Sequence, residues 1–168
     1  MNIESKSGML DIEIFKRKTS TGIDFYETTA YDEHKNKLGF INFQILDKSI
    51  WYGSSHKTAW IYLIETEEKY QHKGIGKTLL DVMEYVAVLN KCENIEGKYY
   101  PTNEYAKPFY LKNGYSIEVD DYEQFVIKHL DKEENFLIAH RMQTALKSKF
   151  EIQTASKKAD LSLESTNA

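Results

Sequence analysis

The segment Ala59–Lys77, AWIYLIETEEKYQHKGIGK, decides the expected fold. Its first part, Ala59–Thr66, is almost continuously apolar, as is typical of a central strand buried on both faces. Its last part places Gly74 and Gly76 just before an amphipathic pattern of helical period. Glycines let backbone N–H groups turn toward one point, and a helix N-terminus adds N–H groups without intrahelical partners. The segment therefore predicts a strand, an anion-binding turn and a long helix.

The hydrophobic period of the chain changes at this segment. Alternating runs before it predict three strands, at Met9–Lys16, Ile23–Asp32 and Leu38–Leu46. After it the pattern predicts a helix at Gly74–Asn90, a strand at Asn94–Tyr100, a helix at Asn103–Lys112, strands at Tyr115–Val119 and Gln124–Leu130, and a helix at Glu134–Phe150. Strands that lead into a crossover helix and a further strand predict an α/β (α+β) fold with a mixed sheet and helices on its faces.

Composition limits the possible functions. The 168 residues carry a net charge of −4, which disfavours a strongly basic nucleic-acid-binding protein. Cys92 is the single cysteine, which excludes an intrachain disulfide and a multi-cysteine metal site and favours a cytoplasmic setting. The histidines lack metal-ligand spacing, so no metal is expected. No run resembles a signal peptide or a membrane span, so no membrane partner is expected.

Three kinds of phosphate loop compete for the segment that ends in the two glycines. A Walker loop, G-x-x-x-x-G-K-[ST], fits the letters GKT at its end but requires a glycine where the sequence has Gln71. A dinucleotide fingerprint, G-x-G-x-x-G, requires a glycine where the sequence has Leu79. The pattern Q-x-x-G-x-G, which Gln71–Gly76 satisfies, is the one that remains.

Together with a second element downstream, this pattern resembles the GNAT family of acetyl-CoA-dependent N-acetyltransferases. The second element is Asn103–Tyr115, NEYAKPFYLKNGY, which is similar to the family's N-x-x-A-x-x-[FL]-Y-x-x-x-G-[FY]. The two elements occur in the family's order, the first between a buried strand and a long helix. The resemblance covers residues 9–130, which we expect to form the acyltransferase domain. Residues 131–150 are expected to form a C-terminal amphipathic helix, and 151–168 a disordered tail.

The resemblance implies a mixed, twisted sheet of about six to seven strands, with helices on both faces. It also implies that the fourth and fifth predicted strands splay apart and that acetyl-CoA, the cosubstrate, lies between them. The cofactor-binding residues that it implies are Ile64, Glu65, Thr66, Gln71, His72, Lys73, Gly74, Ile75, Gly76, Lys77, Asn103 and Tyr110.

The resemblance further implies direct acetyl transfer to an amine. Tyr110 matches the family's general acid, which protonates the departing thiolate. The general base is open, because the two positions where family members carry a catalytic acid are Trp60 and Lys98 here. Glu65, at the end of the fourth strand, is the first choice, and Glu96, on the fifth, is the second. A water chain is the alternative.

The acceptor side differs from many family members, which place helices between the first two strands. Only Thr19–Gly22 fills that gap, so we expect an open acceptor site that suits a small amine, a peptide lysine or a peptide N-terminus. The loop Asp47–Lys57 and the C-terminal helix are candidates for replacing the missing wall. Two rival functions remain: a non-catalytic acyl-CoA-binding module, and an interaction protein that forms a homodimer through the C-terminal helix.

Overall fold

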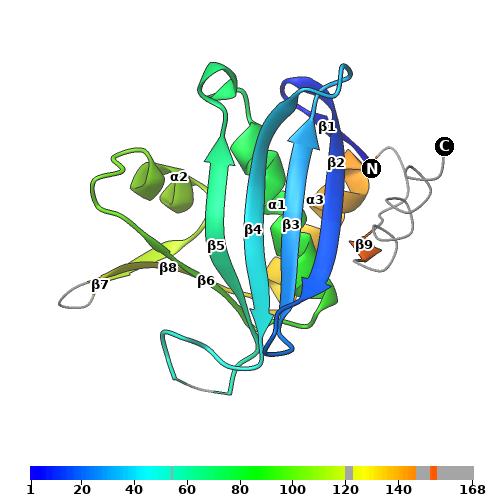
Figure 1. Ribbon diagram of the computed structural model, residues 1–168. Coiled ribbons are helices and arrows are strands. Elements are labelled where there is room, and N and C mark those ends of the chain that lie inside the picture. The colour runs from blue at the N-terminus through cyan, green and yellow to red at the C-terminus, as the bar shows by residue number, and fades with distance from the viewer. Residues whose placement is uncertain (54, 120–122, 147–151, 155–168) are drawn as a thin grey trace.

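The computed structural model describes residues 1–53, 55–119, 123–146 and 152–154 (Figure 1). The elements are β1 (Asn2–Ser5), β2 (Gly8–Lys18), β3 (Asp24–Tyr31), β4 (Lys37–Leu46), β5 (Thr58–Thr66), the 3-10 turn η1 (Glu68–Tyr70), α1 (Ile75–Leu89), β6 (Asn94–Tyr99), α2 (Ala106–Lys112), β7 (Ser116–Val119), β8 (Gln124–His129), α3 (Lys132–Ala145) and β9 (Gln153–Thr154).

The strands form one mixed sheet in the order β1-β2-β3-β4-β5-β6-β8-β7, with β9 paired to β2. Strands β1 to β5 are successive antiparallel neighbours, and α1 is the crossover that makes β6 parallel to β5. The mixed sheet predicted from the sequence is thus confirmed. The nine strands exceed the expected six to seven chiefly because the short polar strands β1 and β9 gave no recognisable pattern.

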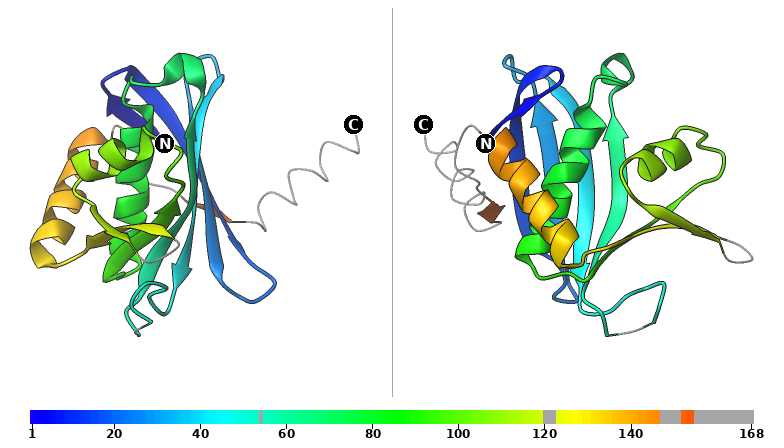
Figure 2. Two further views of the ribbon diagram at one scale, coloured as in Figure 1. Left: turned by 90° about the vertical axis from the view of Figure 1, so that its left-hand side faces the viewer. Right: turned by 180° about the vertical axis from the view of Figure 1, so that it is seen from behind.

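Helices α1 and α3 lie together on one face of strands β1 to β5 (Figure 2). Helix α1 buries Leu79, Leu80 and Met83 in a core that also contains Ile12 and Ile41 from the sheet. The expectation of helices on both faces does not hold for this part of the sheet, because no helix in the described ranges covers the opposite face (Figure 2). Within the described residues, no helix is inserted between β2 and β3, because their connection is a tight turn.

The apolar pattern of residues 134–150 predicts a helix face formed by Phe136, Leu137, Met142, Leu146 and Phe150, but α3 packs only partly through these residues. Its buried residues are Ile138 and Met142, whereas Phe136 is 68% exposed and Leu137 is 45% exposed. The expected shared face that included Phe136 and Leu137 is therefore wrong, and Phe150 lies outside the described residues. Because α3 packs beside α1, it cannot replace the missing wall on the open face.

The predicted tail, 151–168, lies mostly outside the described residues. Within it, β9 pairs in parallel with Phe15 and Lys16 of β2. Among the helices of the described ranges, none combines the length and the apolar character needed to cross a bilayer.

Candidate active site

Strands β5 and β6 separate part-way along β5 (Figure 1). They pair in parallel only where Thr58–Ile61 faces Asn94–Gly97. Beyond that level, Tyr62–Thr66 pairs with β4 alone among the described strands, so within that part of the chain its backbone groups on the β6 side have no strand partner. Such an edge accepts an extended ligand as an added strand. The splay predicted between the fourth and fifth predicted strands is confirmed.

A β-bulge marks the same level of β5. On β4, Asn42 faces Leu63 and Phe43 faces Ile61, which leaves Tyr62 as the extra residue. Tyr62 is 66% exposed and Leu63 is 46% exposed. The opening between β5 and β6, which we call the wedge, therefore begins at a bulged strand with apolar side chains at the surface.

The turn before α1 leaves backbone N–H groups open near the end of β5. Gly74 is the N-cap, with φ at +87° and no side-chain capping bond. The first helical hydrogen bond runs from Thr78 N to the Gly74 carbonyl at 3.0 Å. The N–H groups of Ile75, Gly76 and Lys77 thus have no intrahelical acceptor, and together with the helix dipole they favour an anion.

This anion cradle, Gln71–Lys77, is fixed to the neighbouring elements by close packing. Gln71 Nε2 donates a hydrogen bond to the carbonyl of Thr66 at 3.3 Å. A Cβ atom on Gly76 would lie 3.4 Å from Thr66 Oγ1 and 3.5 Å from Phe109 Cε2. Gly76 therefore sits where the cradle, β5 and α2 meet, and the absence of a side chain leaves its N–H group accessible.

The side chains of two further cradle residues, His72 and Lys73, contact neighbouring aromatic rings. His72 adopts a positive φ of +61°, and its exposed ring lies 6.2 Å from that of Tyr105 at the rim of α2. Lys73 places its ammonium 5.4 Å from the centroid of the Tyr70 ring. Both contribute backbone to the cradle, and their side chains lie at its surface.

Asn103 lies in the turn that precedes α2. Its Oδ1 accepts a hydrogen bond from Tyr105 N at 3.2 Å, and its carbonyl accepts one from Ala106 N at 3.1 Å. These bonds form a local turn, so the predicted helix Asn103–Lys112 begins later, at Ala106. The exposed Asn103 side chain remains near the surface, on the β6–α2 connection.

Tyr110 is the buried residue of α2, with 4% of its surface exposed. Its ring packs edge-on against Phe109 and Tyr115, at centroid distances of 5.3 and 5.4 Å. It belongs to the same core as Ile64 of β5 and Tyr99 of β6, the two strands that border the wedge. Burial raises the pKa of Tyr110, so the phenol stays protonated at neutral pH.

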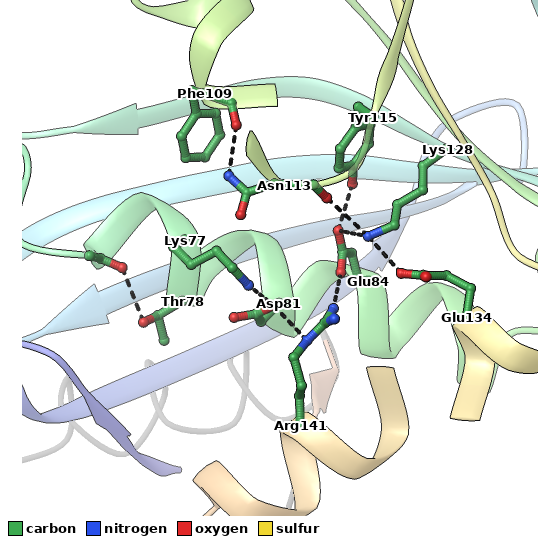
Figure 3. Close-up of polar contacts among 11 residues, drawn as sticks. Lys77, Thr78, Asp81, Glu84, Phe109, Asn113, Tyr115, Lys128, Glu134 and Arg141 are labelled. Carbon is green, nitrogen blue, oxygen red and sulfur yellow. Dashed lines mark hydrogen bonds and ion pairs between the residues drawn. The ribbon is translucent and has the colours of Figure 1, made fainter. Parts of the chain in front are cut away.

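A buried charge network holds Tyr115, whose ring packs against Tyr110 (Figure 3). Glu84, on α1, accepts hydrogen bonds from the Tyr115 hydroxyl at 3.1 Å, from Lys128 Nζ at 3.0 Å and from Arg141 Nη2 at 2.8 Å. Burial raises the pKa of Glu84, while the charges of Lys128 and Arg141 act in the opposite direction. Lys128 Nζ also donates to the carbonyl of Asn113 at 3.2 Å, at the end of α2. The network thus ties α1, α2, β8 and α3 together.

The two candidate bases differ sharply in their surroundings. Glu65 is exposed on the last part of β5, beside the wedge. Glu96 is fully buried, and its carboxylate accepts hydrogen bonds from the Ser49 hydroxyl, from Ile50 N at 3.0 Å and from Trp51 N at 3.1 Å. Its oxygens are therefore engaged in holding the loop between β4 and β5, and Glu65 is the better placed of the two.

The candidate active site thus consists of a splayed parallel strand pair, a glycine cradle at the end of β5 and a buried tyrosine on α2. The profile of the Acetyltransferase (GNAT) family matches residues 9–115 of the chain. The chain belongs to the GNAT family. A search of curated protein sequences finds no significant match.

Solved structures share the GNAT fold. The PaiA N-acetyltransferase of Thermoplasma acidophilum, in complex with coenzyme A, is 23% identical with a TM-score of 0.54; the match covers 63% of this chain and 61% of that one. Arabidopsis thaliana NAA60, in complex with a bisubstrate analogue, is 18% identical with a TM-score of 0.55, over 66% and 78% of the chains. A chain of the NatC complex, bound to Gag peptide and CoA, is 17% identical with a TM-score of 0.52, over 62% and 71%.

Sequence reasoning missed the charge network of this GNAT chain, although a signal was present. Glu84 interrupts the apolar face of α1 between Leu80 and Val88, and Lys128 interrupts the apolar run of β8. A charge within an otherwise buried pattern indicates a buried partner, since an unpaired buried charge is strongly unfavourable. In the described ranges, no group of three or more His, Cys, Asp and Glu side chains is suited to hold a metal ion.

Proposed function

We propose that this GNAT protein is an acyl-CoA-dependent N-acyltransferase that moves an acetyl group from acetyl-CoA to a primary amine. The observation that carries the proposal is the coincidence of three features along β5. The strand loses its β6 partner, bulges at Tyr62 and ends beside the anion cradle. An extended thioester arm fits the unpaired edge, and the phosphates at its far end fit the cradle N–H groups.

The residues divide the work of direct transfer among them. The cradle and the edge Ile64–Thr66 hold the cosubstrate, and Asn103 adds a polar contact from the β6–α2 connection. A neutral amine attacks the thioester carbonyl carbon and forms the C–N bond as the C–S bond breaks. Glu65, directly or through water, accepts the proton that the amine loses. The Tyr110 hydroxyl donates a proton to the departing thiolate, which its raised pKa keeps available.

The acceptor approaches from the open face of the sheet. Among the described helices, none covers that face (Figure 2), and Tyr62 and Leu63 at the bulge are exposed. An open approach suits a flexible amine, such as a peptide N-terminus, a lysine side chain or a small polyamine. Two solved relatives, bound to a bisubstrate analogue and to a peptide, are consistent with a peptide acceptor.

A non-catalytic acyl-CoA-binding role is the alternative, and the engagement of Glu96 by the β4–β5 loop favours it. An acceptor screen separates the two functions. The purified protein is incubated with acetyl-CoA and with polyamines, amino acids, aminoglycosides or peptides, and free thiol is measured. Thiol release that depends on the amine supports transfer. Tight coenzyme binding without any amine-dependent release of thiol would support the non-catalytic binding role instead.

A further inference from the structure

The N-terminal hairpin β1–β2 lies against the anion cradle. The Ser7 hydroxyl, in the turn of this hairpin, donates a hydrogen bond to the carbonyl of Lys73. A Cβ atom on Gly74 would lie 3.5 Å from Lys6 Cβ and 4.0 Å from Lys6 Cγ. The hairpin turn thus forms a wall beside Gly74. Because the family match begins at residue 9, Lys6 and Ser7 come from outside it.

The lysines around the cradle differ in the partners they already have. Lys77 forms an ion pair with Asp81, one turn along α1. Lys73 lies over the ring of Tyr70. Lys6 is exposed and, within the described part of the chain, it takes part in no ion pair, side-chain hydrogen bond or ring contact. The stem of Lys6 thus lies beside Gly74, and its ammonium is available to an incoming anion.

We propose that Lys6 is a phosphate-binding residue of the coenzyme site, carried to the cradle by the N-terminal hairpin. The inference rests on the proposed function. Coenzyme A offers two phosphate groups to such a cation, the pyrophosphate and the 3′-phosphate of the ribose. A lysine ammonium binds phosphate as a compact point charge on a flexible stem, so it needs no fixed geometry before the ligand binds. The bond from Ser7 to Lys73 keeps the hairpin turn next to the cradle.

Calorimetric titration of coenzyme A and 3′-dephospho-coenzyme A into the full chain tests this role. Lys6→Ala is expected to weaken coenzyme A binding about fivefold, as for an exposed charge pair. Lys6→Glu is expected to weaken it several times further, because repulsion replaces attraction. The matched control is Lys48→Ala, which removes the same charge from an exposed lysine beyond the opposite end of β4. The control is expected to leave both affinities unchanged.

The two ligands identify which phosphate Lys6 contacts. Equal weakening for both ligands assigns Lys6 to the pyrophosphate, and weakening for coenzyme A alone assigns it to the 3′-phosphate. Wild-type affinity in both Lys6 variants, with normal coenzyme binding by the wild type, would overturn the inference and leave the proposed function intact. Absence of binding by the wild type would remove the proposed function and the inference with it.

Discussion

The hydroxyl of Tyr115 donates a hydrogen bond of 3.1 Å to Glu84 Oε1, and both residues are almost completely buried. The contact joins the centre of α1, whose N-terminus carries the cradle, to the residue that packs edge-on against Tyr110. Lys128 and Arg141 complete the surroundings of the Glu84 carboxylate. The proposed phosphate anchor and the proposed acid are thus held to one another through a paired buried charge.

Removal of this charge is expected to destabilise the fold. Glu84→Ala removes one of the two carboxylates paired with the buried Lys128 ammonium, together with the acceptor of the buried Tyr115 hydroxyl. We expect a loss of about 3–5 kcal/mol in the free energy of unfolding, measured by urea denaturation. Glu27→Ala is the control, since its side chain is 40% exposed and the loss of its ion pair with Arg17 should cost about 1 kcal/mol or less. Equal losses for both variants would contradict the buried role of Glu84.

Tyr110→Phe should slow turnover without weakening coenzyme binding. The substitution keeps the ring between Phe109 and Tyr115 and removes only the proton donor. A thiolate leaves fairly readily unaided, so we expect a loss on the order of 10²-fold, at the lower end of general acid catalysis. Steady-state kinetics and calorimetry on the same sample separate the two effects. Tyr105→Phe, an exposed tyrosine before α2, is the control; wild-type turnover in Tyr110→Phe would exclude the acid role.

The pH dependence of the rate should reflect the raised pKa of Tyr110. Burial raises this pKa above its usual value, so the acid stays protonated as the pH increases. The amine acceptor, by contrast, becomes more reactive as it loses its proton. We therefore expect kcat/KM to rise with pH up to about 10, the ordinary tyrosine pKa, without a falling limb. A falling limb near pH 8 in the wild type, with stability unchanged, would show that another group is the acid.

Gly76→Val should weaken coenzyme binding and, to a smaller extent, the fold. A side chain here meets Thr66 Oγ1 and Phe109, and it also covers N–H groups of the cradle. We expect at least a tenfold loss of coenzyme affinity by calorimetry and about 1–3 kcal/mol of destabilisation by overpacking. Gly76→Ala is the matched comparison, because its Cβ atom alone would lie 3.4 Å from Thr66 Oγ1 and 3.5 Å from Phe109 Cε2, which are ordinary contact distances, and it should leave the fold nearly unchanged. Unchanged affinity in Gly76→Val would refute the pyrophosphate assignment.

Cys92 should be inert in the native protein. The thiol is 3% exposed, and burial raises its pKa to about 12, so almost no thiolate forms below pH 9. We expect no reaction with a disulfide thiol reagent at pH 8 until denaturant is added, when one thiol per chain reacts. A native thiol signal would mean that Cys92 becomes exposed through local opening. An inert Cys92 also means that a thiol-release assay reports coenzyme A alone.

The sequence predicted the elements whose patterns are local. The spacing of apolar residues predicted helix α1, and Gly74 and Gly76 predicted the turn before it. Both signals depend only on residues close together in the sequence. The start of α2 was misplaced because the Asn103 side chain bonds the N–H of Tyr105 and keeps the chain in a turn. Strand β1 was missed because four polar-rich residues carry too little alternation.

Long-range pairings lay beyond the sequence. Glu96 is the second candidate base, and its carboxylate accepts hydrogen bonds from the β4–β5 loop, 45 to 47 residues earlier in the chain. No local pattern specifies that contact. In the same way, the charges of Glu84 and Lys128 are visible in the sequence, whereas their pairing depends on how α1 packs beside β8.

The separation of β5 from β6 has a mechanical consequence. Thr58–Ile61 of β5 is joined to β6 by main-chain hydrogen bonds, whereas Tyr62–Thr66 is not. Only a short stretch of paired backbone therefore connects the two parts of the sheet. A ligand that forms hydrogen bonds along Tyr62–Thr66 and also contacts the start of α1 would extend this connection. A cosubstrate bound there would add to the connection between the two parts of the sheet, and its release would remove that contribution.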